Sequence, residues 1–321
     1  MSAANGQGHW ATMAEIGSAK GILILFWIYK LLGRLPFQIA LFPVTFYYFA
    51  FKPRQRHASR EFLTRCATRP NEPERRAGTW RVLRHFSSFG GALLDKFVAW
   101  NGGFSFKDVT FEGYDAVKAT LDRGQGLLLL GSHLGNLEIC RVLSQLRPGL
   151  RLRVLVHTRH ATTFNRLLER LNPSSTVSLQ QVTELGVGEA AELSAWVAGG
   201  GVVLIAADRV PVGASEGRPA RVTFAPFLGH QAPFPQGPFI LGSLLGCPAF
   251  TLFCVRRGRR FEATFEPFAE PLLLPRRDRE RALADYTARY AERLEERCRS
   301  APLQWFNFFP FWSQHEVIRS S

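Results

Sequence analysis

The sequence predicts an α/β fold: a central mixed, mostly parallel sheet flanked by helices, preceded by a hydrophobic helical segment that anchors the chain to a membrane. Three observations support this prediction. From residue 106 onward, short apolar runs alternate with segments of helical periodicity, which is typical of strands joined by crossover helices. Hydrophobic residues make up 46% of the 321 residues, enough for a sizeable core. Residues 21–51 are almost free of charge. We therefore expect a membrane anchor over residues 1–55 and an α/β domain over residues 56–321.

The apolar N-terminal segment consists of two charge-free runs, residues 21–29 and 35–51, separated by a short basic stretch that includes Lys30. Neither run reaches the roughly 20 residues that a spanning helix needs, and prolines interrupt the second. Three arrangements fit: a bent hairpin that enters one leaflet, a tilted span in which Lys30 snorkels to the interface, or a buried helix pair. Basic side chains follow at once and predict a cytoplasmic flank: Lys52, Arg54, Arg56, Arg60 and Arg65.

The next elements are helical. Residues 56–101 have helical periodicity, and the prolines at positions 70 and 73 divide them into two pieces. Residues 109–111 then predict a strand, and residues 115–121 predict the helix that follows it.

The central strand is predicted over residues 126–130, an apolar run that begins at a glycine and is followed by another. A turn follows and contains His133, and a helix is expected over residues 137–146 with Asn136 as its N-cap and Glu138 in its first turn. Ligands of open α/β sheets bind at the carboxyl ends of the strands. A histidine there is well placed to act as a base, and a carboxylate can fix its tautomer.

Two further strands, residues 152–156 and 201–206, also end in ionisable groups. The first leads into Arg159 between two histidines, and the second leads into Asp208 and Arg209. If these strands neighbour the central one, their ends form one polar rim, where arginines could hold a phosphate or a developing oxyanion. Because strand ends are often polar for solubility alone, both interpretations stay open. Helices are expected over residues 164–171 and 189–197.

A motif rich in proline and glycine precedes the last part of the predicted sheet. It contains Phe227, Gly229, Pro235 and Gly237 and leads into a helix over residues 237–245 and a strand over residues 249–255. Charges alternate in sign over residues 279–297 with helical period, which predicts a solvated helix with one packing face.

The segment His-Leu-Gly-Asn-Leu-Glu at 133–138, after an apolar strand, resembles the first motif of the lysophospholipid acyltransferase superfamily. The likeness is greatest to the branch that contains the bacterial late lipid A acyltransferases. The motif from Phe227 to Gly237 is similar to a later motif of that family, which helps to form the substrate site. The resemblance implies that His133 is the general base and that Glu138 supports it. It also implies an acyl thioester donor and the cytoplasmic face of the bacterial inner membrane.

Charge and cysteine content limit the partners. The net charge of +14 suits an anionic membrane surface, an acidic acyl carrier protein or the phosphates of coenzyme A. No helix-turn-helix, zinc or RNA-binding signature points to nucleic acid. The five cysteines lack metal-ligand spacing, so we expect no metal, no cofactor and a reducing compartment.

The function expected from these features is transfer of a fatty acyl group from acyl carrier protein or coenzyme A to a hydroxyl of a lipid or glycolipid. A lipid A precursor is one such acceptor, and Asn136, Arg159, Asp208 and Arg209 are candidates for substrate binding. Two alternatives remain open: a thioesterase or lipid hydrolase on the same fold, and a non-catalytic basic protein that binds lipid at a membrane surface. A serine hydrolase is disfavoured because no Gly-x-Ser-x-Gly elbow is present. The acceptor, the acyl length, the donor and the oligomeric state stay open.

Overall fold

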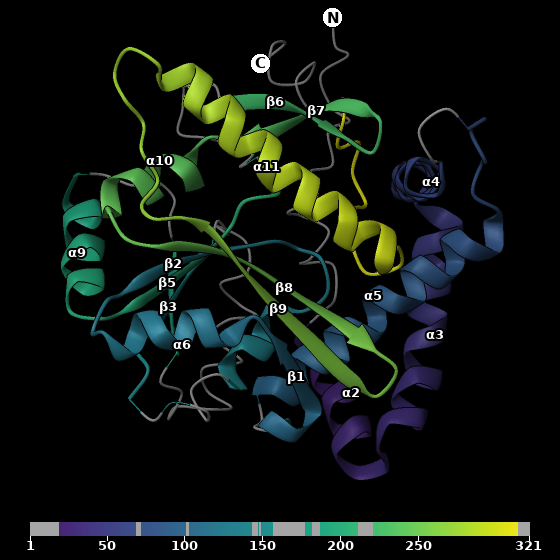
Figure 1. The fold of residues 1–321 in the computed structure, drawn as a ribbon. Coiled ribbons are helices and arrows are strands. Elements are labelled where there is room, and N and C mark those ends of the chain that lie inside the picture. The colour runs from purple at the N-terminus through teal and green to yellow at the C-terminus, as the bar shows by residue number, and fades with distance from the viewer. Residues whose placement is uncertain are drawn as a thin grey trace, which may run out of the picture.

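A seven-stranded sheet forms the centre of the protein, in the order β1-β9-β8-β2-β5-β3-β4 (Figure 1). The computed structural model describes residues 19–68, 72–100, 103–142, 147, 149–156, 177–181, 187–210 and 221–313. The strands of the sheet are β1 (Val109–Glu112), β2 (Leu127–Gly131), β3 (Leu152–Val156), β4 (Val177–Gln181), β5 (Val202–Ala206), β8 (Ala249–Arg257) and β9 (Arg260–Ala269).

The sheet is mixed but mostly parallel, which confirms the α/β part of the predicted fold class. β8 and β9 form an antiparallel hairpin, and β1 joins the outer side of β9 in parallel. The strands from β8 through β2, β5 and β3 to β4 are all parallel to one another. β2 is buried along its whole length, which explains its uninterrupted run of leucines.

Helices cover both faces of the sheet, which divides the core into two layers. Side chains of β2 alternate between these layers: Leu128 and Leu130 face one, and Leu127 and Leu129 face the other. The first layer is closed by α9 (Val187–Ala198), α10 (Gly237–Leu245) and α11 (Arg279–Ser300), and the second by α6 (Tyr114–Asp122).

A small two-stranded sheet, β6 (Val222–Phe227) and β7 (His230–Pro235), packs against α11 (Figure 1). Its turn contains Leu228 and Gly229, both with positive φ, as a tight hairpin turn requires. The sequence analysis did not predict this hairpin, because its prolines indicate a loop. Prolines are tolerated in edge strands, and a two-stranded sheet consists only of edges.

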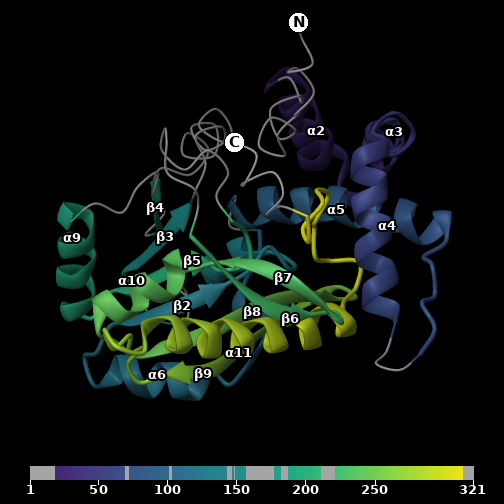
Figure 2. The ribbon, with the colours of Figure 1, turned by 90° about the horizontal axis from the view of Figure 1, so that it is seen from above.

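Within the described residues, four α-helices precede the sheet: α2 (Ala19–Leu32), α3 (Arg34–Phe51), α4 (Pro53–Ala67) and α5 (Thr79–Trp100). α3 packs on α5 through Phe37 and Leu41. Figure 2 shows α2 and α3 at one side of the sheet. Across the part of the chain that is described, no helix combines the length and the apolar character that crossing a bilayer demands. Large apolar side chains of α2 and α3 are nevertheless exposed, among them Ile24, Trp27, Leu31, Leu32, Leu35, Ile39, Phe42, Phe46 and Phe51.

Two predicted helices differ from the structure or lie outside it. The helix expected over residues 137–146 is a 3-10 helix at Leu137–Val142, and residues 143–146 lie outside the described residues. The helix expected over residues 164–171 also lies outside them. The other predicted helices and strands of the α/β domain are present, with ends that shift by a few residues.

Candidate active site

Two neighbouring strands bring a histidine and an aspartate together at their carboxyl ends. β2 and β5 pair in parallel, and Gly131 stands opposite Ala206 at the end of the ladder. Two residues further along each strand come His133 and Asp208, which are 75 residues apart in the sequence. The register of the sheet therefore places these two side chains side by side, at the edge where ligands of α/β sheets bind.

The imidazole of His133 is held in one tautomer. Its Nδ1 lies 2.8 Å from Oδ1 of Asp208, and an ionised carboxylate only accepts hydrogen bonds. Nδ1 therefore carries the proton and donates it, which leaves Nε2 with a free lone pair. The His133 side chain is 39% exposed, so a substrate hydroxyl can approach it. The arrangement is that of a general base oriented by a carboxylate.

Asp208 is a fully buried carboxylate that accepts hydrogen bonds on both oxygens. Its Oδ2 accepts the backbone N–H of His133 at 2.8 Å and the indole N–H of Trp305 at 2.9 Å. Burial alone would raise the pKa of Asp208, but the His133 ring, Arg209 and the Trp305 N–H outweigh this effect. The pKa of the carboxyl therefore lies below its usual range, and Asp208 is ionised at neutral pH.

The surroundings of His133 keep its imidazole neutral. Desolvation lowers the pKa of His133, and the positive charges of Arg209 and Lys96 lower it further. The Asp208 carboxylate opposes these effects, but the net pKa stays below the ordinary value for histidine. A neutral imidazole at physiological pH is the form that can accept a proton.

The turn that carries His133 is fixed by backbone contacts on two sides. Gly135 N donates to Gln304 O at 2.8 Å, and Asn136 N donates to Cys254 O at 2.9 Å. Gly135 has a φ of +70°, and a Cβ there would come within 1.8 Å of the Cys254 carbonyl oxygen. Only glycine fits this position, because any side chain would push the turn away from β8.

The end of β2 is fixed as well. The hydroxyl of Tyr290, a fully buried residue of α11, donates to Gly131 O at 2.7 Å. The backbone N–H of Ala207 donates to the same oxygen at 2.9 Å. β2, β5 and α11 are therefore joined directly before the His133 turn begins.

Glu138, which the resemblance places in support of His133, forms an ion pair with Lys96 at 3.1 Å. The carboxylate that contacts the ring nitrogen of His133 is Asp208, which the sequence analysis placed in substrate binding. The positive charge of Lys96 also acts on His133, so the Glu138–Lys96 pair is connected electrostatically to the base. Asn136 accepts the backbone N–H of Glu138 on its side-chain oxygen at 3.1 Å, as expected of an N-cap.

Arg209 lies beside Asp208 and brings a cation to the site. Its guanidinium donates to Phe306 O at 2.8 Å and stands over the ring of Phe309, with 5.5 Å between the guanidinium carbon and the ring centroid. Arg159, the other cation predicted at this rim, lies outside the described residues, as do the two histidines beside it.

The residues of the later motif lie in and after the β6–β7 hairpin. Phe227 is fully buried and packs on Trp305, with 5.3 Å between the ring centroids. Gly229 occupies the hairpin turn, Pro235 ends β7, and Gly237 begins α10. Phe227 connects this motif to the site, because it packs on Trp305 and the indole N–H of Trp305 donates to Asp208.

A buried chain of hydrogen bonds behind the site was not found by the sequence analysis. His85 on α5 is fully buried, with Nε2 3.0 Å from Trp305 O and Nδ1 2.8 Å from the Ser59 hydroxyl on α4. Through Trp305 and Asp208 this chain ends at His133. No local pattern marks it, because its members come from five distant segments and are brought together only by packing.

The fold and this site together define a class of protein. The site contains a neutral histidine that a buried carboxylate orients, and it lies at the carboxyl edge of a mixed α/β sheet. Such a site is typical of an enzyme that removes a proton from its substrate. A family model described as bacterial lipid A biosynthesis acyltransferase matches residues 20–314. The chain therefore belongs to this family and is an acyltransferase. No curated protein matches the chain significantly.

Proposed function

We propose that this protein transfers a fatty acyl group from an acyl thioester to a hydroxyl of a lipid A precursor, at the cytoplasmic face of the bacterial inner membrane. The observation that carries the proposal is the His133–Asp208 pair, because it leaves a free, accessible Nε2 on a neutral imidazole. Family membership supports acyl transfer and a lipid A acceptor.

The reaction needs only one proton carrier. His133 Nε2 takes the proton of the acceptor hydroxyl as its oxygen attacks the thioester carbonyl, and the carbonyl electrons move onto oxygen. The tetrahedral intermediate collapses, the bond between carbon and sulfur breaks, and the thiolate leaves. The imidazolium then returns its proton to the thiolate. Asp208 stabilises the imidazolium between these two steps, because its negative charge lies 2.8 Å from Nδ1.

Cations around His133 are suited to the negative charge that develops on the carbonyl oxygen. Arg209 and Lys96 both act electrostatically on the imidazole. We assign oxyanion stabilisation to Arg209 or to Arg159, because five of the six backbone N–H groups of the 133–138 turn already donate within the protein. Glu138 is proposed to support catalysis by holding Lys96, while Asp208 orients the ring directly.

The membrane association that we propose uses one leaflet. The exposed apolar side chains of α2 and α3 favour a hairpin laid into the headgroup and acyl boundary over a buried helix pair. Lys30 and Arg54 are exposed near these helices, and their positive charges suit anionic headgroups. The net charge of +14 likewise favours an acidic carrier protein or coenzyme A as the donor.

Lipid mass spectrometry tests the proposal. Cells that express the wild-type protein are expected to contain a lipid class that gains one acyl group, and cells that express His133→Ala are not. Circular dichroism and thermal unfolding of the purified variant serve as the folding control, because loss of the imidazole removes one hydrogen bond from the buried Asp208 carboxylate. Wild-type acyl transfer by His133→Ala would refute the mechanism. Release of free fatty acid without an acylated lipid would instead identify a hydrolase.

A further inference from the structure

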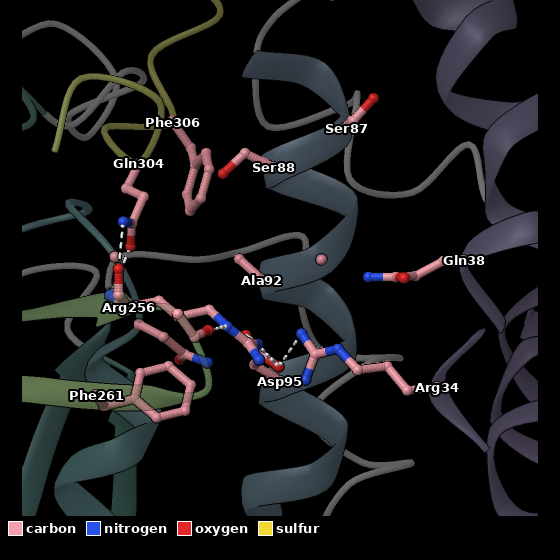
Figure 3. Close-up of a pocket in the computed structure, with 14 residues that line it drawn as sticks. Arg34, Gln38, Ser87, Ser88, Ala92, Asp95, Arg256, Phe261, Gln304 and Phe306 are labelled. Atoms are coloured by element: carbon pink, nitrogen blue, oxygen red, sulfur yellow. Dashed lines mark hydrogen bonds and ion pairs between the residues drawn. The ribbon is translucent and has the colours of Figure 1, made fainter. Parts of the chain in front are cut away.

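A polar cavity of about 250 Å³ lies directly behind the His133 turn (Figure 3). It is bounded by α3, by α5, by the β8–β9 hairpin and by the segment after α11. Gly135 and Asn136 of the turn form part of its wall. A water molecule takes up roughly 30 Å³ of liquid, so the cavity has room for a group of several heavy atoms.

Two arginines and one aspartate dominate the charge of this cavity. Figure 3 shows Arg34 of α3 and Arg256 of β8 reaching Asp95 of α5 from opposite sides. The Arg34 guanidinium lies 3.0 Å from the Asp95 carboxylate, and Arg256 Nη1 lies 2.6 Å from its Oδ1. Asp95 is almost fully buried. One carboxylate against two guanidinium groups leaves one positive charge in excess, which favours an anion.

The arginines also have hydrogen-bond donors to spare. Arg256 uses Nε on Gly258 O and Nη1 on Asp95, and its backbone is fixed by Gln304. Its Nη2 has no hydrogen-bond partner among the described residues. Arg34 contacts Asp95 through Nη2, and its Nε and Nη1 have no partner within the described ranges of the chain. Fixed guanidinium donors of this kind match the oxygens of a phosphate group.

A buried amide in the wall of the cavity lacks a partner too. Asn136 is only 7% exposed, and its Nδ2 has no hydrogen-bond partner in the described part of the chain. Leaving a buried N–H unsatisfied is unfavourable, so this amide gains a partner if a ligand acceptor enters the cavity and the Asn136 side chain turns toward it. Ser88 and Gln38 add polar side chains to the same wall.

We propose that this cavity binds a phosphate group carried by the acceptor lipid. The proposal rests on the proposed function, since it assigns a subsite to the acceptor. Two features favour the acceptor over the donor as the source of the phosphate. Arg34 belongs to α3, whose exposed apolar side chains lie where lipid chains are expected. Asn136 belongs to the same turn as His133 and lines the cavity, so a headgroup bound here lies against the turn that carries the base.

A purely structural role for the three charges is the competing explanation. One arginine neutralises Asp95, and the pair with Arg256 would be enough to hold α5 to β8. The second guanidinium and the unsatisfied amide are not required for that purpose. Arg34 is 35% exposed, so its replacement tests binding without removing a buried charge.

The kinetic experiment compares Arg34→Gln with wild-type protein on a phosphorylated lipid A precursor and on the same glycolipid after removal of its phosphate. We expect Arg34→Gln to raise KM for the phosphorylated acceptor about tenfold, with kcat and the donor KM unchanged. Wild type and variant should use the dephosphorylated acceptor equally well. Arg277→Gln, which removes one exposed arginine before α11, is the matched charge control and should behave as wild type.

Two kinetic outcomes would overturn the proposal. An equal loss on both acceptors would mean that Arg34 is structural. A rise confined to the donor KM would place the donor's phosphate in the cavity instead.

A binding experiment makes failure of this proposal distinguishable from failure of the proposed function. Inorganic phosphate should raise the thermal unfolding midpoint of wild-type protein and of His133→Ala, relative to sodium chloride of equal ionic strength. Arg34→Gln should lose this stabilisation, and Arg277→Gln should keep it. If phosphate stabilises all of these proteins equally, or none of them, the cavity is not a phosphate site, whether or not the protein transfers acyl groups.

Discussion

Replacing Asp208 by asparagine is expected to move the proton of His133 to the wrong nitrogen. Asp208 Oδ2 accepts two N–H donors, from the His133 backbone and the Trp305 indole. An asparagine must point its oxygen at these donors, because its NH₂ group would clash with them. Its NH₂ group then faces His133 Nδ1, which has to become an acceptor. The ring proton is displaced to Nε2, so the nitrogen that should receive the substrate proton is already occupied.

The magnitude follows from the loss of general-base catalysis. Such catalysis contributes about 100- to 10,000-fold, or about 2.7 to 5.4 kcal/mol in the barrier. We expect kcat of Asp208→Asn to fall by that factor, with both KM values little changed because neither substrate loses a binding contact. The number of hydrogen bonds at position 208 is preserved, so the free energy of unfolding should fall by only about 1 kcal/mol.

The matched control is Glu138→Gln. Like Asp208→Asn, this change converts a carboxylate into an amide. The carboxylate of Glu138 is partly buried and is paired with Lys96. Acyl transfer measured with both variants, together with nitrogen NMR of the His133 ring, separates the two roles. We expect the tautomer to change in Asp208→Asn only. Near-normal turnover by Asp208→Asn, with a large loss in Glu138→Gln, would refute the orienting role assigned to Asp208.

Three further predictions concern pH and the membrane. The acid limb of the pH profile of kcat/KM should lie below pH 6.5, because the pKa of His133 is lowered. Arg209→Gln removes a positive charge beside His133 and should move this limb to higher pH. A limb that does not move would contradict the assignment of His133 as the base. Burial lowers the pKa of His85 to about 4. The neutral ring therefore contributes fully to the free energy of unfolding above pH 6.5, and this contribution is lost as pH falls toward 4. The loss of stability over this pH range amounts to roughly 3 kcal/mol. Urea unfolding at several pH values should show this loss in the wild-type protein and not in His85→Gln. Replacing the exposed Leu35 and Ile39 together by serine should weaken binding to anionic vesicles, measured by flotation, by about 100-fold. Leu273→Ser changes a similarly exposed leucine of the α/β domain and should leave binding unchanged. Equal binding by both variants would contradict the one-leaflet anchor.

Local patterns in the sequence were enough to predict much of the fold. Apolar runs with glycine boundaries predicted the central strands, and the order of strand and helix predicted a mostly parallel sheet. Because the carboxyl ends of parallel neighbours share one edge, the sequence also indicated that His133 and the Asp208–Arg209 pair would meet if their strands were neighbours, which they are. The β6–β7 hairpin was not predicted, because its prolines lack the backbone N–H that a central strand needs. An edge strand does not need every N–H, and the sequence alone does not show that these strands are edges.

The sequence by itself determined the chemical groups: a histidine after a buried strand, glycine where the turn meets β8, and enough apolar residues for two core layers. Only the tertiary structure decided which carboxylate orients that histidine. Glu138 is five residues away along the chain and pairs with Lys96, whereas Asp208 is 75 residues away and contacts the ring. Periodicity reports which residues share a face of one element, because it arises from the geometry of a single helix or strand. Contacts such as those from Trp305 to Asp208, or from Arg34 to Asp95, depend on how several elements pack, and no local spacing records them.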